Sequence, residues 1–120
     1  MFGIYNMTKP NKISKMPPAM VTALLKNLGR NIKTARLRRE LRLEDVANRI
    51  GISRYLLSEI EKGKPTASMA SYVGALWALD LTSELKNLAN PDNDEEGKAL
   101  EARRSPKTAS KRHKALDNDF

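Results

Sequence analysis

Five side chains that can form hydrogen bonds stand close together near the middle of the chain: Arg54, Tyr55, Ser58, Glu59 and Lys62. Apolar residues fill the positions between them at the spacing of a helix that buries one side, so the polar side chains would lie on the outer side. Such a row of donors and acceptors suits the edges of DNA bases, because an arginine can pair with guanine O6 and N7 and a glutamate can accept from cytosine N4. We therefore expect Arg54, Tyr55, Ser58 and Glu59 to read bases in the major groove.

Basic and hydroxyl residues around this row are candidates for contacts with DNA phosphates, whose charge lysine and arginine neutralise. The candidates are Ser53, Arg36, Arg42, Lys62 and Lys64. Ser53 is also expected to cap the helix by accepting a hydrogen bond from an early backbone N–H.

Two short helices joined by a tight turn would position these side chains within residues 41–64. The apolar residues with helical spacing are Val46, Ala47 and Ile50 in the first helix and Leu56, Leu57 and Ile60 in the second. Gly51 can adopt the left-handed backbone that stops the first helix, and Gly63 with Pro65 ends the second. Two helices, a glycine turn and a polar outer face on the second helix predict a helix-turn-helix.

The segment around this turn resembles the phage-repressor-type (XRE/Cro) helix-turn-helix family. The matching residues are Ala47, Gly51, Ile52-Ser53, Leu57, Ile60-Glu61 and Lys62-Gly63, in the order A…G-[IV]-[ST]…[LI]-S-x-[IL]-E-x-G. The likeness covers about residues 25–89 and implies an all-α, five-helix, lambda-repressor-like domain. Its outer stretches, LGRNIKTARLRRELRLEDVA and SMASYVGALWALDLTSELKNLANPD, are similar to HipB-like antitoxin repressors, which partner HipA-type kinase toxins.

The resemblance also implies a partner for Arg36. The matching arginine of the family pairs with the glutamate of the E-x-G motif, which is Glu61 here. Such an ion pair would tie the preceding helix to the end of the helix that carries the polar row. Breaking it would leave a charge without its partner, which is costly where the site is buried.

The chain departs from the family at Leu41-Arg42-Leu43, where the family pattern is L-[TS]-Q. The capping Thr or Ser is missing, and Glu44 with Asp45 is expected to compensate through the helix dipole. Leu43 cannot make the hydrogen bonds of the glutamine. Arg42 could instead contact phosphate.

The sequence divides into three parts. Residues 1–18 hold three lysines and three prolines and are expected to form a flexible basic arm, which either contacts DNA or has no fixed role. Residues 19–90 hold the domain, and residues 91–120 form a polar tail that is expected to be disordered on its own. Further helices of the domain are expected from Ala19 or Ala23 to Glu40, at about Ser68–Leu79 with Thr66 or Ser68 as cap, and at about Ser83–Ala89 with Thr82 or Ser83 as cap.

Apolar residues of the last two helices and of the tail are candidates for protein contacts. The expected dimer interface comprises Trp77, Leu81, Leu85 and Leu88. Trp77 could alternatively belong to the core. Leu116 and Phe120 are expected to anchor a partner toxin, with residues 103–114 on an acidic toxin surface or on DNA; the alternative is a tail that only aids solubility.

The net charge of +8 is unevenly distributed: residues 1–22 carry +3, residues 23–90 carry +5 and residues 91–120 sum to zero. A basic domain and arm are typical of a nucleic-acid binder. The absence of cysteine excludes disulfides and thiolate metal sites and fits a cytoplasmic protein. No apolar run approaches the roughly 18 residues of a membrane span, and we expect no signal peptide.

Residue patterns typical of enzymes are missing from the sequence. His113 is the single histidine, and there is no P-loop, no G-x-G-x-x-G and no nucleophile with a matching base. The carboxylates of Glu44-Asp45 and Glu95-Glu96 are neighbours in sequence, and adjacent residues on a helix do not face each other. We expect no catalysis, no metal and no cofactor.

Together these features predict a sequence-specific DNA-binding repressor that binds a palindromic operator in double-stranded DNA as a homodimer. The narrower resemblance implies the antitoxin of a HipBA-like operon, which binds a HipA-like kinase toxin and represses its own promoter. Two alternatives remain. One is a free-standing phage-type or metabolic regulator without a toxin, and the other is an adaptor that uses the helix-turn-helix fold to bind protein.

Overall fold

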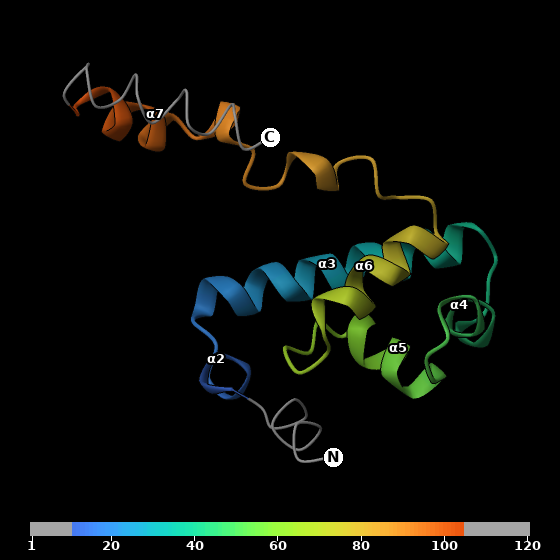
Figure 1. The fold of residues 1–120 in the computed structure, drawn as a ribbon. Coiled ribbons are helices and arrows are strands. Elements are labelled where there is room, and N and C mark those ends of the chain that lie inside the picture. Colours follow the sequence, from blue (N-terminus) through green and yellow to red (C-terminus); the bar gives the residue numbers. More distant parts are fainter. Residues whose placement is uncertain (1–10, 105–120) are drawn as a thin grey trace, which may run out of the picture. The chain divides into compact units, whose positions relative to one another are not determined.

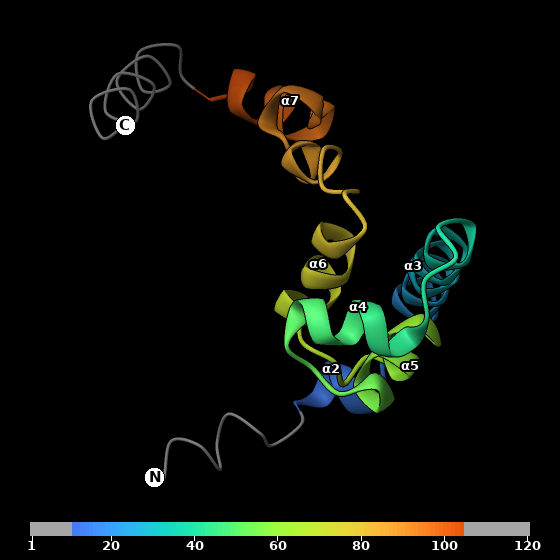
Figure 2. The ribbon, with the colours of Figure 1, turned by 90° about the vertical axis from the view of Figure 1, so that its right-hand side faces the viewer.

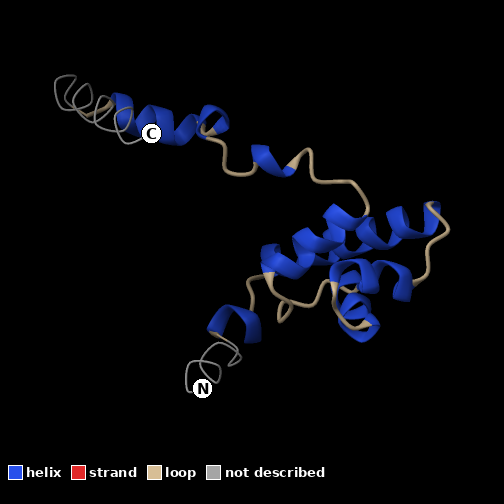
Figure 3. Cartoon of the chain, turned by 45° about the vertical axis from the view of Figure 1, so that its right-hand side comes forward, coloured by secondary structure: helices blue, strands red, loops and turns tan. Residues whose placement is uncertain are grey.

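The structure is a computed structural model that describes residues 11–104, and every regular element of this part is helical (Figure 3). The elements in chain order are α2 (Lys12–Lys15), α3 (Ala19–Arg38), α4 (Leu43–Ile50), α5 (Arg54–Glu61), α6 (Met69–Ala78), the 3-10 helices η1 (Leu85–Asn87) and η2 (Pro91–Asn93), and α7 (Glu95–Ala102). The all-α class predicted from the sequence is confirmed. Between residues 11 and 104, no helix combines the length and the apolar character needed to cross a bilayer.

The chain forms two compact units, one ending at Ser83 and the other beginning at Glu84. In the first unit, α5 packs against α3, α4 and α6, and α4 also packs against α6 (Figures 1 and 2). The largest completely buried side chains are Ile32, Val46, Leu57, Ile60 and Leu79. Because these residues come from α3, α4, α5 and the end of α6, the core fixes the orientation of α5.

The turn between α4 and α5 forms as its sequence predicted. Gly51 ends α4 in a left-handed conformation, with φ of 84°, which costs a glycine little because it has no Cβ. The Ser53 hydroxyl then accepts a hydrogen bond of 3.0 Å from the N–H of Leu56 and so caps α5. The turn thereby sets which residues of α5 face outward.

The first turn of α4 is stabilised without a Ser or Thr cap. Arg42 occupies the cap position, and the Asp45 carboxylate accepts a 2.8 Å hydrogen bond from the Arg42 backbone N–H. A capping box has two hydrogen bonds, and this is the one that the third residue of the helix accepts. The other cannot form, because an arginine side chain has no acceptor for a backbone N–H. Asp45 therefore compensates by a direct hydrogen bond in addition to its charge near the helix start.

Gly29 in the middle of α3 allows α5 to approach very closely. A Cβ at this position would lie 2.6 Å from the backbone oxygens of both Ile60 and Glu61. Glycine weakens an isolated helix by about 1 kcal/mol. Here it permits backbone contact between α3 and the end of α5, which places Glu61 beside α3.

Helix α6 is fixed at both ends by polar contacts. Ser68 caps its start by accepting from the N–H of Ser71, and Arg49 donates to the carbonyl of Ala78 at its end. The hydroxyl of buried Tyr72 donates to the carbonyl of Lys64 at 2.8 Å. These bonds connect α6 to α4 and to the segment that follows α5.

The segment expected to form a fifth helix is mostly irregular. Its only regular element is η1, and the preceding residue, Glu84, gives no side-chain cap; the expected caps Thr82 and Ser83 lie outside η1. A 3-10 helix of one turn is common where an α-helix cannot be nucleated. The prediction of an α-helix over about residues 83–89 is therefore wrong.

Regular structure also occurs where the sequence predicted flexible segments. In the tail, Asp94 caps α7 by accepting from the N–H of Gly97, and Glu95 and Glu96 lie in the first turn, where the helix dipole favours acidic residues. In the arm, Asn11 caps the single turn of α2. Residues 95–102 are therefore helical in the structure, and the expectation that residues 91–120 are disordered on their own stays a prediction.

Candidate nucleic-acid interface

The outer face of α5 carries the polar row that the sequence predicted. Leu57 and Ile60 are buried on the inner face, so Arg54 and Tyr55 are exposed while Ser58 and Glu59 are half-buried. Tyr55 is 73% exposed. These side chains are therefore presented to a partner on one side of one short helix.

A surface hollow of about 540 Å³ lies between the starts of α4 and α5. It is lined by Arg42, Leu43, Glu44, Arg54, Tyr55 and Ser58. The fold thus joins three of the four predicted base-reading residues to Arg42, a predicted phosphate contact. It also adds Leu43 and Glu44, which were not expected to take part; the departure from L-[TS]-Q was the signal for Leu43 in the sequence.

Glu59 contacts its neighbour Tyr55 on the same helix face and does not line the hollow. The hydrogen bond between the Tyr55 hydroxyl and the Glu59 carboxylate raises the pKa of Tyr55, and the negative charge of Glu59 adds to this effect. Residues four apart are neighbours on a helix surface, which makes this contact possible. The Glu59 carboxylate is thus an acceptor within reach of the Tyr55 hydroxyl on the same helix.

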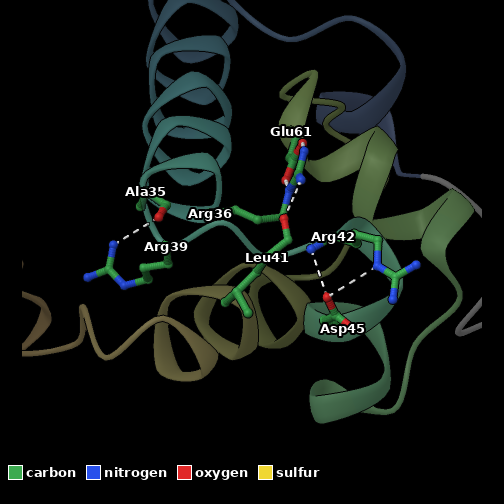
Figure 4. A network of polar contacts seen from close by, with 7 residues as sticks. All are labelled: Ala35, Arg36, Arg39, Leu41, Arg42, Asp45 and Glu61. Atoms are coloured by element: carbon green, nitrogen blue, oxygen red, sulfur yellow. Dashed lines mark hydrogen bonds and ion pairs between the residues drawn. The ribbon is translucent and has the colours of Figure 1, made fainter.

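Arg42 is held loosely at the rim of the hollow. Its Nε lies 3.8 Å from Asp45 Oδ2 (Figure 4). Its Nη1 lies 3.3 Å from Glu44 Oε1, and its side chain is mostly exposed. Exposed ion pairs of this kind contribute little to stability. The guanidinium can therefore leave these carboxylates for a phosphate at small cost.

Arg36 occupies a different environment, in the interior beside α5. Its Nε lies 2.7 Å from Glu61 Oε2, its Nη2 lies 3.0 Å from Glu61 Oε1, and its Nη1 donates to the carbonyl of Leu41 at 2.9 Å (Figure 4). The hydrogen bond to Glu61 raises the pKa of Arg36. The ion pair implied by the family resemblance is thus present in the structure.

This geometry corrects the expectation that Arg36 contacts DNA phosphates. The residue is only 7% exposed and all three guanidinium nitrogens already have acceptors. A phosphate could reach it only if the buried carboxylate lost its partner, which is strongly unfavourable. Ser53, Lys62 and Lys64 are exposed and remain as candidates for phosphate contacts, together with Arg42.

Comparison with known families agrees with this geometry. A family described as "Helix-turn-helix domain" matches residues 27–88, which is slightly more than half of the chain. The chain belongs to this helix-turn-helix family. No curated protein matches the sequence. The family and the exposed row on α5 together make the chain a DNA-binding regulator.

The residues expected to mediate protein contacts of this helix-turn-helix regulator fall into both units. In the first unit, Trp77 is 61% exposed and Leu81 is 39% exposed, so Trp77 does not belong to the core. In the second unit, Leu85 is half-buried and Leu88 is exposed. Leu116 and Phe120, the expected anchors for a toxin, lie outside the described residues.

Proposed function

We propose that this helix-turn-helix protein is a sequence-specific transcriptional repressor that binds a palindromic operator in double-stranded DNA and has no catalytic activity. The observation that carries the proposal is the shared hollow in which Arg54, Tyr55 and Ser58 of α5 meet Arg42 at the start of α4. Side chains for base edges and an exposed cation for a phosphate lie together on one face. This is the combination that positions a helix in a groove and lets it read sequence.

The repressor acts as a homodimer in this proposal, since a palindromic site has two equivalent halves. Apolar residues on the outside of α6 support it: Met69 and Trp77 are exposed, and half-buried Val73 lies between them at four-residue spacing. Exposed apolar residues in one row are typical of a surface that a partner covers. Leu81, which is 39% exposed and follows the end of this helix, is the other candidate of the first unit.

The more specific role is that of the antitoxin in a HipBA-like operon, acting in the cytoplasm on a HipA-like kinase toxin. Its support is the resemblance of the stretches on both sides of the motif to HipB-like repressors. In this role the protein represses its own promoter, and residues 91–120 contact the toxin. A free-standing phage-type or metabolic regulator would use the same DNA-binding face without a toxin.

Carboxylates near the hollow favour a second candidate function, a protein-binding adaptor. Glu44 and Asp45 lie beside Arg42, Glu59 lies beside Tyr55, and all three reduce the positive charge of this face. Repulsion of phosphates by carboxylates would weaken DNA binding, whereas a protein partner could complement both charges. If the protein is an adaptor, it should therefore show no preference among DNA sequences.

A single binding experiment separates these functions. The full chain is titrated against a duplex that covers the promoter of its own operon and against a shuffled duplex of equal length. A repressor shifts the promoter duplex at lower concentration, and the Arg54→Ala variant loses that preference. Equal affinity for both duplexes would favour the adaptor. Addition of a kinase encoded by the adjacent gene then tests the antitoxin role, because deletion of residues 91–120 should weaken the kinase complex and leave operator binding intact.

A further inference from the structure

Two residues that line the hollow between α4 and α5 present apolar surface, which hydrogen bonding to DNA does not explain. Leu43, the first residue of α4, and Tyr55, in the first turn of α5, both line it. Leu43 is half-buried, so part of its side chain remains accessible. Two apolar side chains from different helices thus meet on the face where Arg54 and Ser58 are presented.

Most of what the two side chains offer to a base is carbon. Leucine has no hydrogen-bonding group, and tyrosine has one hydroxyl, for which Glu59 is an acceptor within reach on the same helix. What Tyr55 exposes, with 73% of its surface accessible, is chiefly its ring. The pair therefore presents carbon atoms to whatever occupies the hollow.

In the major groove, base pairs present one apolar group, the methyl on C5 of thymine, while the other groups at the base edges are mostly hydrogen-bond donors and acceptors. A polar base edge placed against Leu43 and Tyr55 would lose its water without gaining a partner, which is unfavourable. A methyl group placed there would instead leave water for an apolar contact. The apolar part of the hollow, formed by Leu43 and Tyr55, therefore favours a methyl group over a polar base edge.

We infer that Leu43 and the ring of Tyr55 form a recognition site for the C5-methyl group of a pyrimidine, which makes Leu43 a specificity-determining residue of the DNA interface. This inference rests on the proposed function. The methyl group can belong to thymine or to 5-methylcytosine, which present the same group at the same place in the groove. Arg54 and Ser58, on the same rim, are placed to bond the polar edges of neighbouring bases.

The test uses the full chain and a duplex that it selects from a random DNA library. That duplex is then synthesised in three forms: unmodified, with every thymine replaced by deoxyuridine, and with every cytosine replaced by 5-methylcytosine. Loss of one contacted methyl should reduce affinity about fourfold, from the transfer free energy of one carbon group. Weaker binding of the deoxyuridine duplex assigns the methyl to thymine, and tighter binding of the methylcytosine duplex assigns it to 5-methylcytosine.

Substitutions in the hollow show whether the effect of the methyl group on affinity depends on Leu43. Leu43→Ala should bind the methylated and unmethylated forms with nearly equal affinity, whereas Tyr55→Phe, which keeps the ring, should discriminate like the original chain. Leu37→Ala is the matched control, because Leu37 is an exposed leucine of α3 outside the hollow. The ratio of two affinities for one variant does not depend on the folded fraction, so partial unfolding of Leu43→Ala does not disturb the comparison.

The outcomes separate this inference from the function on which it rests. If no duplex is enriched, the proposed function fails and the inference fails with it. If a duplex is enriched but neither modification changes its affinity by more than twofold, the methyl site is wrong and the proposed function stands. A methyl effect that persists in Leu43→Ala also overturns the assignment to Leu43.

Discussion

Gly29 lies directly against the backbone of Glu61, so closely that a Cβ at position 29 would lie 2.6 Å from the Glu61 carbonyl oxygen. The close approach of α3 to the end of α5 also lets the Arg36 side chain reach the Glu61 carboxylate. One backbone contact and one ion pair thus hold together the long first helix of the domain and the helix that carries the polar row.

Substitution of Gly29 by alanine should destabilise the protein, although alanine is the better helix former. Propensity alone predicts a gain of about 1 kcal/mol. The added methyl would overlap two backbone carbonyls that no rotamer can move, and overpacking of this kind costs about 1–3 kcal/mol. We expect a net loss, seen as a lower midpoint in urea. Asn31→Ala, at an exposed position of the same helix, is the control and should not lower the midpoint; a stabilised Gly29→Ala would show that the helices can separate slightly.

Loss of one partner of the Arg36–Glu61 pair should be strongly destabilising. Both side chains are less than 10% exposed, so Arg36→Met would leave Glu61 charged, buried and without its main partner, at about 3–5 kcal/mol. Thermal unfolding measures the loss, and combination with Glu61→Gln should recover part of it. Arg38→Met replaces an exposed arginine of the same helix and should change stability by less than about 0.5 kcal/mol. An unchanged melting temperature for Arg36→Met would refute the structural role.

Arg54 and Lys62 should affect DNA binding in different ways. Arg54 lines the hollow, so Arg54→Ala should weaken operator binding by about 1–3 kcal/mol and relax the preference at one base position. Lys62 is exposed at the end of α5, so Lys62→Ala should weaken all duplexes alike and reduce the slope of log affinity against log salt by about 1. Titrations at several salt concentrations measure both. Unchanged affinity and preference for Arg54→Ala would remove it from the base-reading residues.

Dimerisation should depend on Trp77. A charge at this exposed apolar position, as in Trp77→Asp, should shift sedimentation from dimer to monomer at concentrations on the order of tens of micromolar. Leu24→Asp is the matched control, because Leu24 is similarly exposed on α3. Trp77 is the only tryptophan, so its fluorescence emission should also shift to longer wavelength on dilution of the unmodified chain. A monomer at these concentrations, with and without operator, would contradict the proposed dimer.

Stability should fall at alkaline pH through Tyr72. Burial raises its pKa above the ordinary 10.0, because the charged phenolate is disfavoured inside the protein. The neutral phenol therefore stabilises the fold fully below pH 10, and this contribution is lost as the pH rises through the pKa of the folded state. Melting temperatures between pH 8 and 11 should decline less steeply for Tyr72→Phe, which cannot ionise. Parallel declines in the two proteins would assign the effect to other groups.

The sequence by itself determined the features that depend on a few consecutive residues. Gly51 predicts the end of α4, Ser53 predicts the cap of α5, and the spacing of Leu57 and Ile60 predicts which side of α5 is buried. Backbone dihedral preferences and hydrogen bonds within one turn decide such features, so their signals lie within a few positions of one another. The helix-turn-helix could be predicted for the same reason.

Contacts between elements distant in the sequence decided the remaining features. Arginines crowd α3 and its exit, and the packing of α5 decides that Arg36 is buried while Arg42 remains exposed at the rim of the hollow. Trp77 is large and apolar, as core residues usually are, yet no element of the first unit covers it. From the sequence, Leu43 was only a residue that cannot make the hydrogen bonds of the family's glutamine. Its apolar surface becomes part of a site only because Tyr55, on another helix, lines the same hollow. The burial of a side chain depends on which other elements pack against it, and the sequence of a single helix does not specify those elements.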